Sequence, residues 1–122
     1  MFKRSEKVGE AVHEIVTELL VKGLKDPRIG FVTITGVKVT DDMHYATVYF
    51  TVFGDDAARK DTEAGLNSAR GFMRREMGKK LRMRYVPEII FRYDTSLDTG
   101  NRIDELMREI KAHEQQYNSE DQ

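Results

Sequence analysis

The sequence predicts a single α+β domain in which helices lie mainly on one face of a three-stranded mixed sheet. First, the apolar pattern runs in order through a helical segment, two strand-like segments, a long helical segment interrupted by glycines, a strand-like segment and a last helical one. Second, a helix that connects two strands of one sheet makes a right-handed crossover, so the third strand should run parallel to the second. Third, 122 residues, 39% of them hydrophobic, suit one domain with one core.

The first element is predicted to be a helix over about residues 5–24. Its apolar positions recur at helical spacing: Val8, Ala11, Val12, Ile15 and Leu19. Glutamates at i,i+4 spacing form an acidic row on another side: Glu6, Glu10, Glu14 and Glu18. Because like charges at this spacing oppose the helix, burial of the apolar side must stabilise it. The helix should stop before Pro27, since the residue that precedes a proline is disfavoured in the α region.

Two strands are expected over residues 31–40 and 44–53, joined by a short turn at residues 41–43. The apolar alternation of the first strand changes phase at Gly36, which predicts a β-bulge there. The second strand carries apolar residues on both faces, so it should be central in the sheet. A third strand is expected over residues 86–93.

A long helical segment is predicted over about residues 57–82. Its apolar stripe consists of Leu66, Ala69, Met73, Met77 and Leu81. Gly65, Gly71 and Gly78 lie inside the segment, and each costs about 1 kcal/mol relative to alanine in a helix interior. At least one of these glycines should therefore mark a break or kink.

A last helix is expected over about residues 97–113, with apolar residues on one side. Beyond it the composition turns polar, which is typical of a frayed chain end. We therefore expect the domain to span residues 1–113 and a polar, frayed tail to follow over residues 114–122.

The net charge of −1 conceals an uneven distribution along the chain. Residues 70–92 sum to +6, whereas residues 93–122 sum to −5. One short basic segment in an almost neutral chain indicates a localised anion-binding surface rather than a generally basic protein.

The basic segment is typical of a surface that contacts nucleic-acid phosphates. On a helical wheel, Arg75, Lys79 and Arg82 gather opposite the apolar stripe. Gly71 and Gly78 lie beside this row, where the lack of a side chain would let a sugar–phosphate backbone approach. A helix that starts anew after a kink would also direct free N–H groups at an anion. The candidate RNA-binding residues of this segment are Arg70, Gly71, Arg74, Arg75, Gly78, Lys79, Lys80, Arg82 and Arg84.

An ordinary solvated helix face is the alternative explanation of these cations. The segment itself offers Glu76 as the one nearby acid that can neutralise the row, which favours binding. A smaller basic group at the start of the first helix is a candidate extension of the RNA surface: Lys3, Arg4 and Lys7.

The sequence carries no recognisable catalytic or metal site. It has no cysteine, which excludes a thiolate metal site, and its three histidines fall on different predicted elements. Asp94, Asp98 and Asp104 could hold Mg²⁺, but helix capping and favourable interaction with helix dipoles explain them more simply. Glycine motifs that bind phosphate or carry a nucleophilic serine are absent. We expect no enzyme activity, no metal and no cofactor.

Cysteine usage and hydropathy also bear on the compartment. The lack of cysteine fits a reducing environment. No apolar run has the length of a membrane span, and the N-terminus lacks the apolar region of a signal peptide. We expect a cytoplasmic monomer without a membrane partner.

The outer sheet face offers a rival binding surface, because Tyr45, Tyr49 and Phe53 recur at a period of two. Aromatic residues on an open sheet can stack on bases, but strands favour aromatic residues in any case. Packing under the last helix or against another partner competes with base stacking at this face. The alternative function is therefore a protein-interaction module that uses the aromatic sheet face.

Four segments of the chain carry a family pattern, in this order and with short gaps. They are residues 26–37 (DPRIGFVTITGV), 46–50 (ATVYF), 67–75 (NSARGFMRR) and 81–91 (LRMRYVPEIIF). Over roughly residues 3–110 the sequence resembles the bacterial ribosome-binding factor A family.

The resemblance implies a type II KH-like fold of order α-β-β-α-(kink)-α-β with a C-terminal helix, and an RNA-binding domain over residues 1–113. Ordinary KH domains clamp nucleotides with a G-x-x-G loop between two helices. The family instead carries Ala-x-Gly in an interrupted helix, which adds Ala69 to the candidate RNA-binding residues and argues against the usual single-strand clamp.

The function that the resemblance implies is non-enzymatic ribosome assembly. Such a factor binds the small (30S) ribosomal subunit and 16S rRNA during late maturation and rRNA processing, leaves before translation, and is associated with growth in the cold. Other assembly factors are further candidate partners.

Overall fold

The computed structural model describes residues 3–96 and 110–111. Its elements are α1 (Arg4–Lys22), β1 (Val32–Val39), β2 (Tyr45–Val52), α2 (Asp56–Ser68), α3 (Arg70–Leu81) and β3 (Glu88–Tyr93). These bounds confirm the segments predicted for this part of the chain to within two residues at their ends. The predicted last helix and the tail at residues 114–122 lie outside the described residues, apart from residues 110–111, which are helical.

The sheet has the strand order β1-β2-β3, so β2 is central as predicted. β1 pairs antiparallel with β2, and β3 pairs parallel with β2, as the right-handed crossover requires. The pairing register shifts between Ile34 and Gly36, which confirms the predicted β-bulge. In the turn that joins β1 to β2, the Asp42 carboxylate accepts hydrogen bonds from the Thr40 hydroxyl at 2.6 Å and the His44 amide at 3.0 Å.

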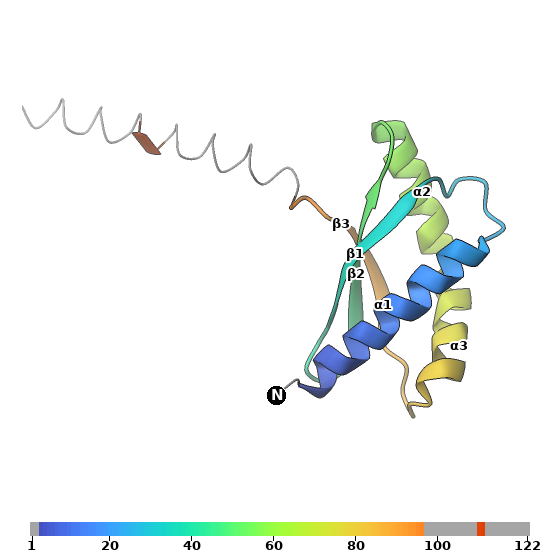
Figure 1. Ribbon diagram of the computed structural model, residues 1–122, viewed down its shortest axis with the longest axis vertical. Coiled ribbons are helices and arrows are strands. Elements are labelled where there is room, and N and C mark those ends of the chain that lie inside the picture. The colour runs from blue at the N-terminus through green and yellow to red at the C-terminus, as the bar shows by residue number, and fades with distance from the viewer. Residues whose placement is uncertain (1–2, 97–109, 112–122) are drawn as a thin grey trace, which may run out of the picture.

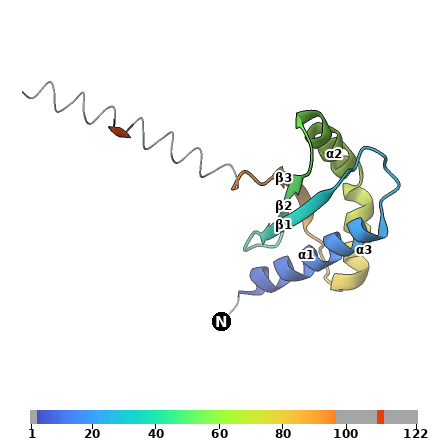
Figure 2. The same cartoon turned by 45° about the horizontal axis from the view of Figure 1, so that its top comes forward.

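The core lies between one face of the sheet and the three described helices (Figures 1 and 2). Phe50 in β2 is fully buried, and its ring meets those of Phe91 and Tyr93 edge to face, with centroids 6.2 and 5.7 Å away. Such pairs contribute about 0.5–1.5 kcal/mol beyond the burial of apolar area. The helices contribute Val12, Ile15, Val16, Leu19, Leu66, Met73 and Met77 to this core.

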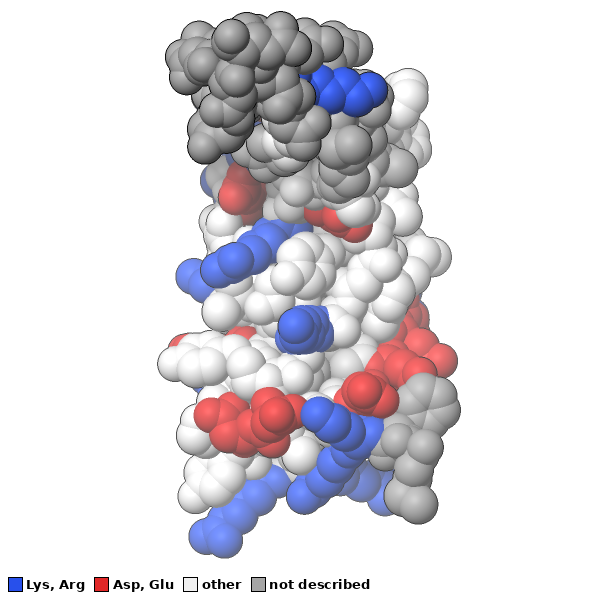
Figure 3. All heavy atoms as spheres, turned by 90° about the vertical axis from the view of Figure 1, so that its left-hand side faces the viewer, with Lys and Arg blue, Asp and Glu red and all other residues white. Residues whose placement is uncertain are grey.

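The opposite face of the sheet carries no helix among residues 3–96 (Figures 1 and 2). Lys38, Tyr45 and Arg92 are exposed there, and Tyr49 is half-buried. Figure 3 looks onto this side and shows basic and acidic side chains interspersed around uncharged surface. The aromatic face predicted from the period of two is therefore open in the part of the chain that the structure describes.

Burial of its apolar side stabilises helix α1 against the repulsion within its row of glutamates. Val12 and Val16 are fully buried, while the glutamates point to solvent. At Gly9 the helix comes so close to β1 that a Cβ atom would lie 3.3 Å from the Val37 carbonyl oxygen. The helix is followed by Gly23, which adopts φ 84°, a conformation that favours glycine. Among the described residues, no helix combines the length and hydrophobicity needed to cross a bilayer.

The predicted break in the long helical segment is at Ala69 and not at a glycine. Gly65 is buried in α2, where a Cβ would lie 2.6 Å from Cγ1 of Ile29. Gly78 lies in α3, where a Cβ would lie 3.2 Å from a methyl group of Val86. These two glycines therefore serve close packing between elements rather than kinking, whereas Gly71 lies in the first turn of α3 with open space beside it.

Replacing Gly65 by alanine should destabilise the fold. The new methyl group must displace Ile29, and overpacking of this kind typically costs about 1–3 kcal/mol, which exceeds the gain of about 1 kcal/mol in helix propensity. The matched change Gly71→Ala meets no neighbour and should raise the free energy of unfolding by up to about 1 kcal/mol. Urea unfolding measures both, and changes of the same sign would contradict this assignment.

Candidate nucleic-acid interface

The basic segment forms a surface on α3, on the break at Ala69 and on the loop that leads to β3. Arg75 projects from α3 into solvent one turn beyond Gly71, as the helical wheel predicts. Arg82 does not continue that row, which corrects the wheel: it ends α3 in a left-handed conformation with φ 51°. Arg84 follows in the loop, with its guanidinium 5.6 Å from the centre of the Tyr85 ring.

Two of the candidate arginines donate hydrogen bonds to backbone carbonyls of the protein itself. The Arg74 guanidinium donates from Nη2 and Nε to the Val86 carbonyl oxygen, at 2.9 and 3.3 Å. Arg70 donates to the Ile89 carbonyl at 3.5 Å, at the long end of hydrogen bonding. These contacts fasten α3 to β3 at its outer edge. Because the acceptors are neutral carbonyls, both arginines keep their positive charge at the surface.

Two of the candidate lysines are paired with carboxylates. Lys79 lies 3.1 Å from Oε1 of Glu76, the acid that the sequence indicated. Lys80 lies 2.9 Å from Oε2 of Glu18 on α1, a partner that sequence reasoning missed. Glu18 also pairs with Lys22, and hydrogen bonds first from Lys80 and then from Lys22 lower the pKa of its carboxyl to about 2. Glu18 is therefore a second acid, besides Glu76, that pairs with a cation of the basic segment.

Arg75, Arg82 and Arg84 remain without a carboxylate partner within the described part of the chain. Gly71 lies beside Arg75 with open space where a side chain would be, which agrees with its predicted role. Gly78 does not share that role, because Val86 packs against it.

A groove of about 350 Å³ separates the break from β3. Its walls come from the end of α2, the start of α3 and the sheet: Tyr45, Asn67, Arg70, Gly71, Arg74, Glu88, Ile89 and Ile90. Ala69 forms the corner between the two helices beside it. Two guanidinium groups and a bare stretch of helix backbone at the mouth of a groove suit a phosphate-bearing strand.

The role of the N-terminal cations as an extension of this surface stays a prediction. Lys3, Arg4 and Lys7 are exposed at the start of α1. The contact between α1 and the basic surface is made by Glu18, which lies about 16 Å further along the helix axis than Lys7.

Among residues 3–96 and 110–111, no catalytic arrangement accompanies these cations. Asp94 is held by the Thr35 hydroxyl at 2.5 Å and by the Ser96 amide at 2.8 Å, and the hydrogen bond from Thr35 is the main cause that lowers its pKa. Asp98 and Asp104 lie outside the described residues. Within residues 3–96 and 110–111, no three histidine, aspartate or glutamate side chains are grouped to hold a metal ion.

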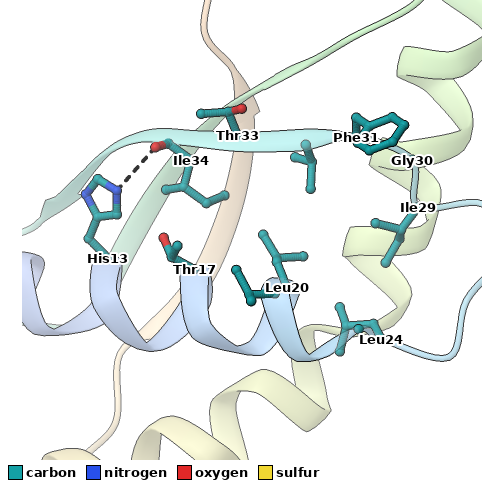
Figure 4. A pocket seen from close by; sticks show the side chains of 12 residues that line it. His13, Thr17, Leu20, Leu24, Ile29, Gly30, Phe31, Thr33 and Ile34 are labelled. Carbon is teal, nitrogen blue, oxygen red and sulfur yellow. Dashed lines mark hydrogen bonds between the residues drawn. The ribbon is translucent and has the colours of Figure 1, made fainter.

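A further groove lies between α1 and β1, as Figure 4 shows. It is lined largely by apolar side chains, among them Leu20, Leu24 and Ile29. His13 is its one titratable side chain, and its Nε2 lies 3.2 Å from the Ile34 carbonyl oxygen. A lone histidine bonded to the backbone offers neither a nucleophile nor an acid–base pair.

Comparison with known proteins identifies the family. The family model described as ribosome-binding factor A matches residues 4–107. The chain belongs to the ribosome-binding factor A family. Ribosome-binding factor A of Geotalea uraniireducens (strain Rf4) is 72% identical over 121 residues, which cover 99% of each chain.

Solved structures of ribosome-binding factor A share this fold. The solution structure of a Thermotoga maritima protein, a putative ribosome binding factor A, is 35% identical with a TM-score of 0.67, covering 76% of this chain and 89% of that one. A homology model of the Thermus thermophilus ribosome binding factor A, fitted into a cryo-EM map of a 30S complex, is 22% identical with a TM-score of 0.56; the match covers 75% of this chain and 92% of that one.

The role of Arg74 can be separated from that of Arg75. Arg74→Ala should lower the free energy of unfolding by about 1 kcal/mol, because the Val86 carbonyl loses two donors. Arg75→Ala removes the same charge without a described partner and should change it by less than about 0.5 kcal/mol. Urea unfolding compares the two, and equal losses would contradict the structural role of Arg74.

The contact of Glu18 should make stability depend on pH. Its pKa falls on folding from 4.5 to about 2, so its ion pairs stabilise the fold above about pH 4.5, and that stabilisation is lost as the pH falls towards 2. Glu18→Gln should therefore be less stable than wild type at pH 7, with a difference that vanishes near pH 2. Thermal unfolding across this range measures it. Glu14→Gln, an exposed glutamate of the same helix, is the control and should show no such convergence.

Proposed function

We propose that this protein is a non-enzymatic assembly factor that binds the small (30S) ribosomal subunit and 16S rRNA during late maturation and rRNA processing. The observation that carries the proposal is family membership, with a relative named ribosome-binding factor A that is 72% identical over almost the whole chain. The Thermus thermophilus protein of the same fold, fitted into a map of a 30S complex, supports the small subunit as partner.

The charge distribution supports RNA as the component that is contacted. Cations on α3 and the following loop lie on one side of the break, and several keep their charge free of carboxylates. We assign the first phosphate contacts to Arg75, Arg82 and Arg84. Lys79 and Lys80 join them only by leaving Glu76 and Glu18.

The mechanism we propose is stabilisation of one rRNA arrangement by differential affinity. A binding protein shifts a conformational equilibrium only as far as it prefers one state over the other. The Arg74 and Arg70 contacts hold α3 on β3, so the basic surface has a fixed shape to which RNA must conform. This mechanism requires no cofactor, metal or nucleotide hydrolysis.

The open sheet face supports a second candidate function, a protein-interaction module. Tyr45 exposes 45% of its surface there, on the same sheet face as the exposed Lys38 and Arg92, and no described helix covers it. RNA binding requires the α3 surface to be intact, whereas protein binding requires the open sheet face. Other assembly factors would be the partners of the open sheet face.

Charge reversal on α3 should remove binding to the small subunit. Arg75→Glu combined with Lys79→Glu should weaken binding to purified 30S subunits by more than about tenfold at moderate salt, because the phosphate contact of Arg75 becomes repulsive and a second carboxylate replaces the ammonium group of Lys79 on the same helix. The apparent association constant of the wild type should also fall by about 0.7–0.9 logarithmic units per tenfold increase in salt for each phosphate contacted. Co-sedimentation over a salt series measures both.

The matched control is Lys38→Glu combined with Arg92→Glu, which makes the same change of charge on the open sheet face. It should retain binding if α3 is the interface. Loss of binding in this variant alone would support the sheet face instead, and wild-type binding by the α3 variant would refute the α3 surface. Unfolding curves of both variants establish that they are folded.

A further inference from the structure

An exposed aromatic ring lies beside the α2–α3 break, off the apolar stripe of α3. Phe72 exposes 43% of its surface, whereas its neighbour Met73 is fully buried. The ring lines a groove of about 500 Å³ together with Leu24 and Ala69. The groove lies between the loop that follows α1 and the corner formed by α2 and α3.

The two walls of this groove are tied to each other. Arg28 donates from Nη2 to the Asp26 carboxylate at 2.6 Å and to the Ser68 hydroxyl at 3.0 Å, which links the loop after α1 to the last turn of α2. Gly23 lines the groove with nothing within 4 Å of the position of a Cβ. The groove is therefore formed before any ligand enters, and a preorganised site loses less conformational entropy on binding.

The rim of the groove is positively charged. Lys25 lines it, and Arg75 lies one helical turn beyond Phe72 on the exposed side of α3. Neither cation has a carboxylate partner among the described residues, while the acid that lines the groove, Asp26, is already paired with Arg28. An exposed ring, with Lys25 in the lining of its groove and Arg75 one helical turn further along α3, complements a nucleotide, whose base stacks on a ring and whose phosphates attract cations.

We propose that Phe72 stacks on an unpaired base of RNA while Lys25 and Arg75 contact the phosphates on either side of it. The inference rests on the proposed function and deepens it, because it names an unpaired nucleotide as the part of the RNA that enters this groove. Every base has an aromatic face, so stacking here requires no base-specific hydrogen bond.

The test compares Phe72→Leu with Phe31→Leu. Both replace an exposed phenylalanine by an apolar residue without an aromatic face, and Phe31, 84% exposed, lies away from this groove. Two probes are used with the full-length protein: purified 30S subunits, and a single-stranded oligoribonucleotide of uridines with one central 2-aminopurine, whose fluorescence is quenched by stacking. Phe72→Tyr, which keeps the ring, is the conservative variant.

Phe72→Leu should weaken binding of the oligoribonucleotide between about 5-fold and 150-fold and abolish the quenching, since stacking contributes about 1–3 kcal/mol per base. Phe31→Leu and Phe72→Tyr should behave as wild type. Quenching and affinity unchanged in Phe72→Leu would overturn the inference. Weaker binding to 30S subunits with unchanged oligoribonucleotide binding would also overturn it, because the groove would then hold a protein segment. If the wild type does not bind 30S subunits at all, the proposed function itself fails.

Discussion

The orientation of α3 is the constraint on which the proposed RNA surface depends. Met73 and Met77 are both fully buried, and their spacing of four residues fixes which side of the helix faces the sheet. Everything on the opposite side, Arg75 above all, must then face solvent. Core packing thus determines which cations of α3 face solvent, and the loop after the helix adds Arg84 to them.

Two contacts along α3 make that orientation specific. Near the middle of the helix, Arg74 reaches the carbonyl of Val86 before β3 begins, and towards the end Lys80 reaches Glu18 on α1. These contacts join α3 to the segment before β3 and to α1, which lies far from it in sequence. Cations therefore divide into those that position the helix and those that remain available to a partner, although all of them look alike in the sequence.

The fold was predictable because its signals are local. The change of phase at Gly36 reports the bulge directly, and the sequence of periodicities sets the order of elements and the parallel third strand. The sequence predicted that the long helical segment is interrupted, but it placed the break at a glycine and not at Ala69. Glycine marks where helix propensity is low, yet Gly65 and Gly78 are used for contacts with Ile29 and Val86, which no local pattern reveals.

The sequence predicted which cations belong to the candidate site, but it did not predict which of them form ion pairs or hydrogen bonds within the protein. The basic segment and the open space at Gly71 follow from the sequence, whereas Lys80 finds a carboxylate 62 positions away and Arg82 leaves the helical row at the left-handed end of α3. The exposure of Phe72 was missed, although an aromatic residue that falls off an apolar stripe is a signal available in the sequence. Long-range contacts decide these details, and periodicity does not encode them.

The carboxylates that hold Lys79 and Lys80 occupy the same positions around these ammonium groups that RNA phosphates would take. A phosphate that arrives must displace Glu76 or Glu18, so the free energy of each such contact is the difference between two ion pairs rather than the whole of one. The affinity of the surface for RNA should therefore be lower than its number of cations implies. Such competition within the protein would favour release of the RNA that we propose it binds.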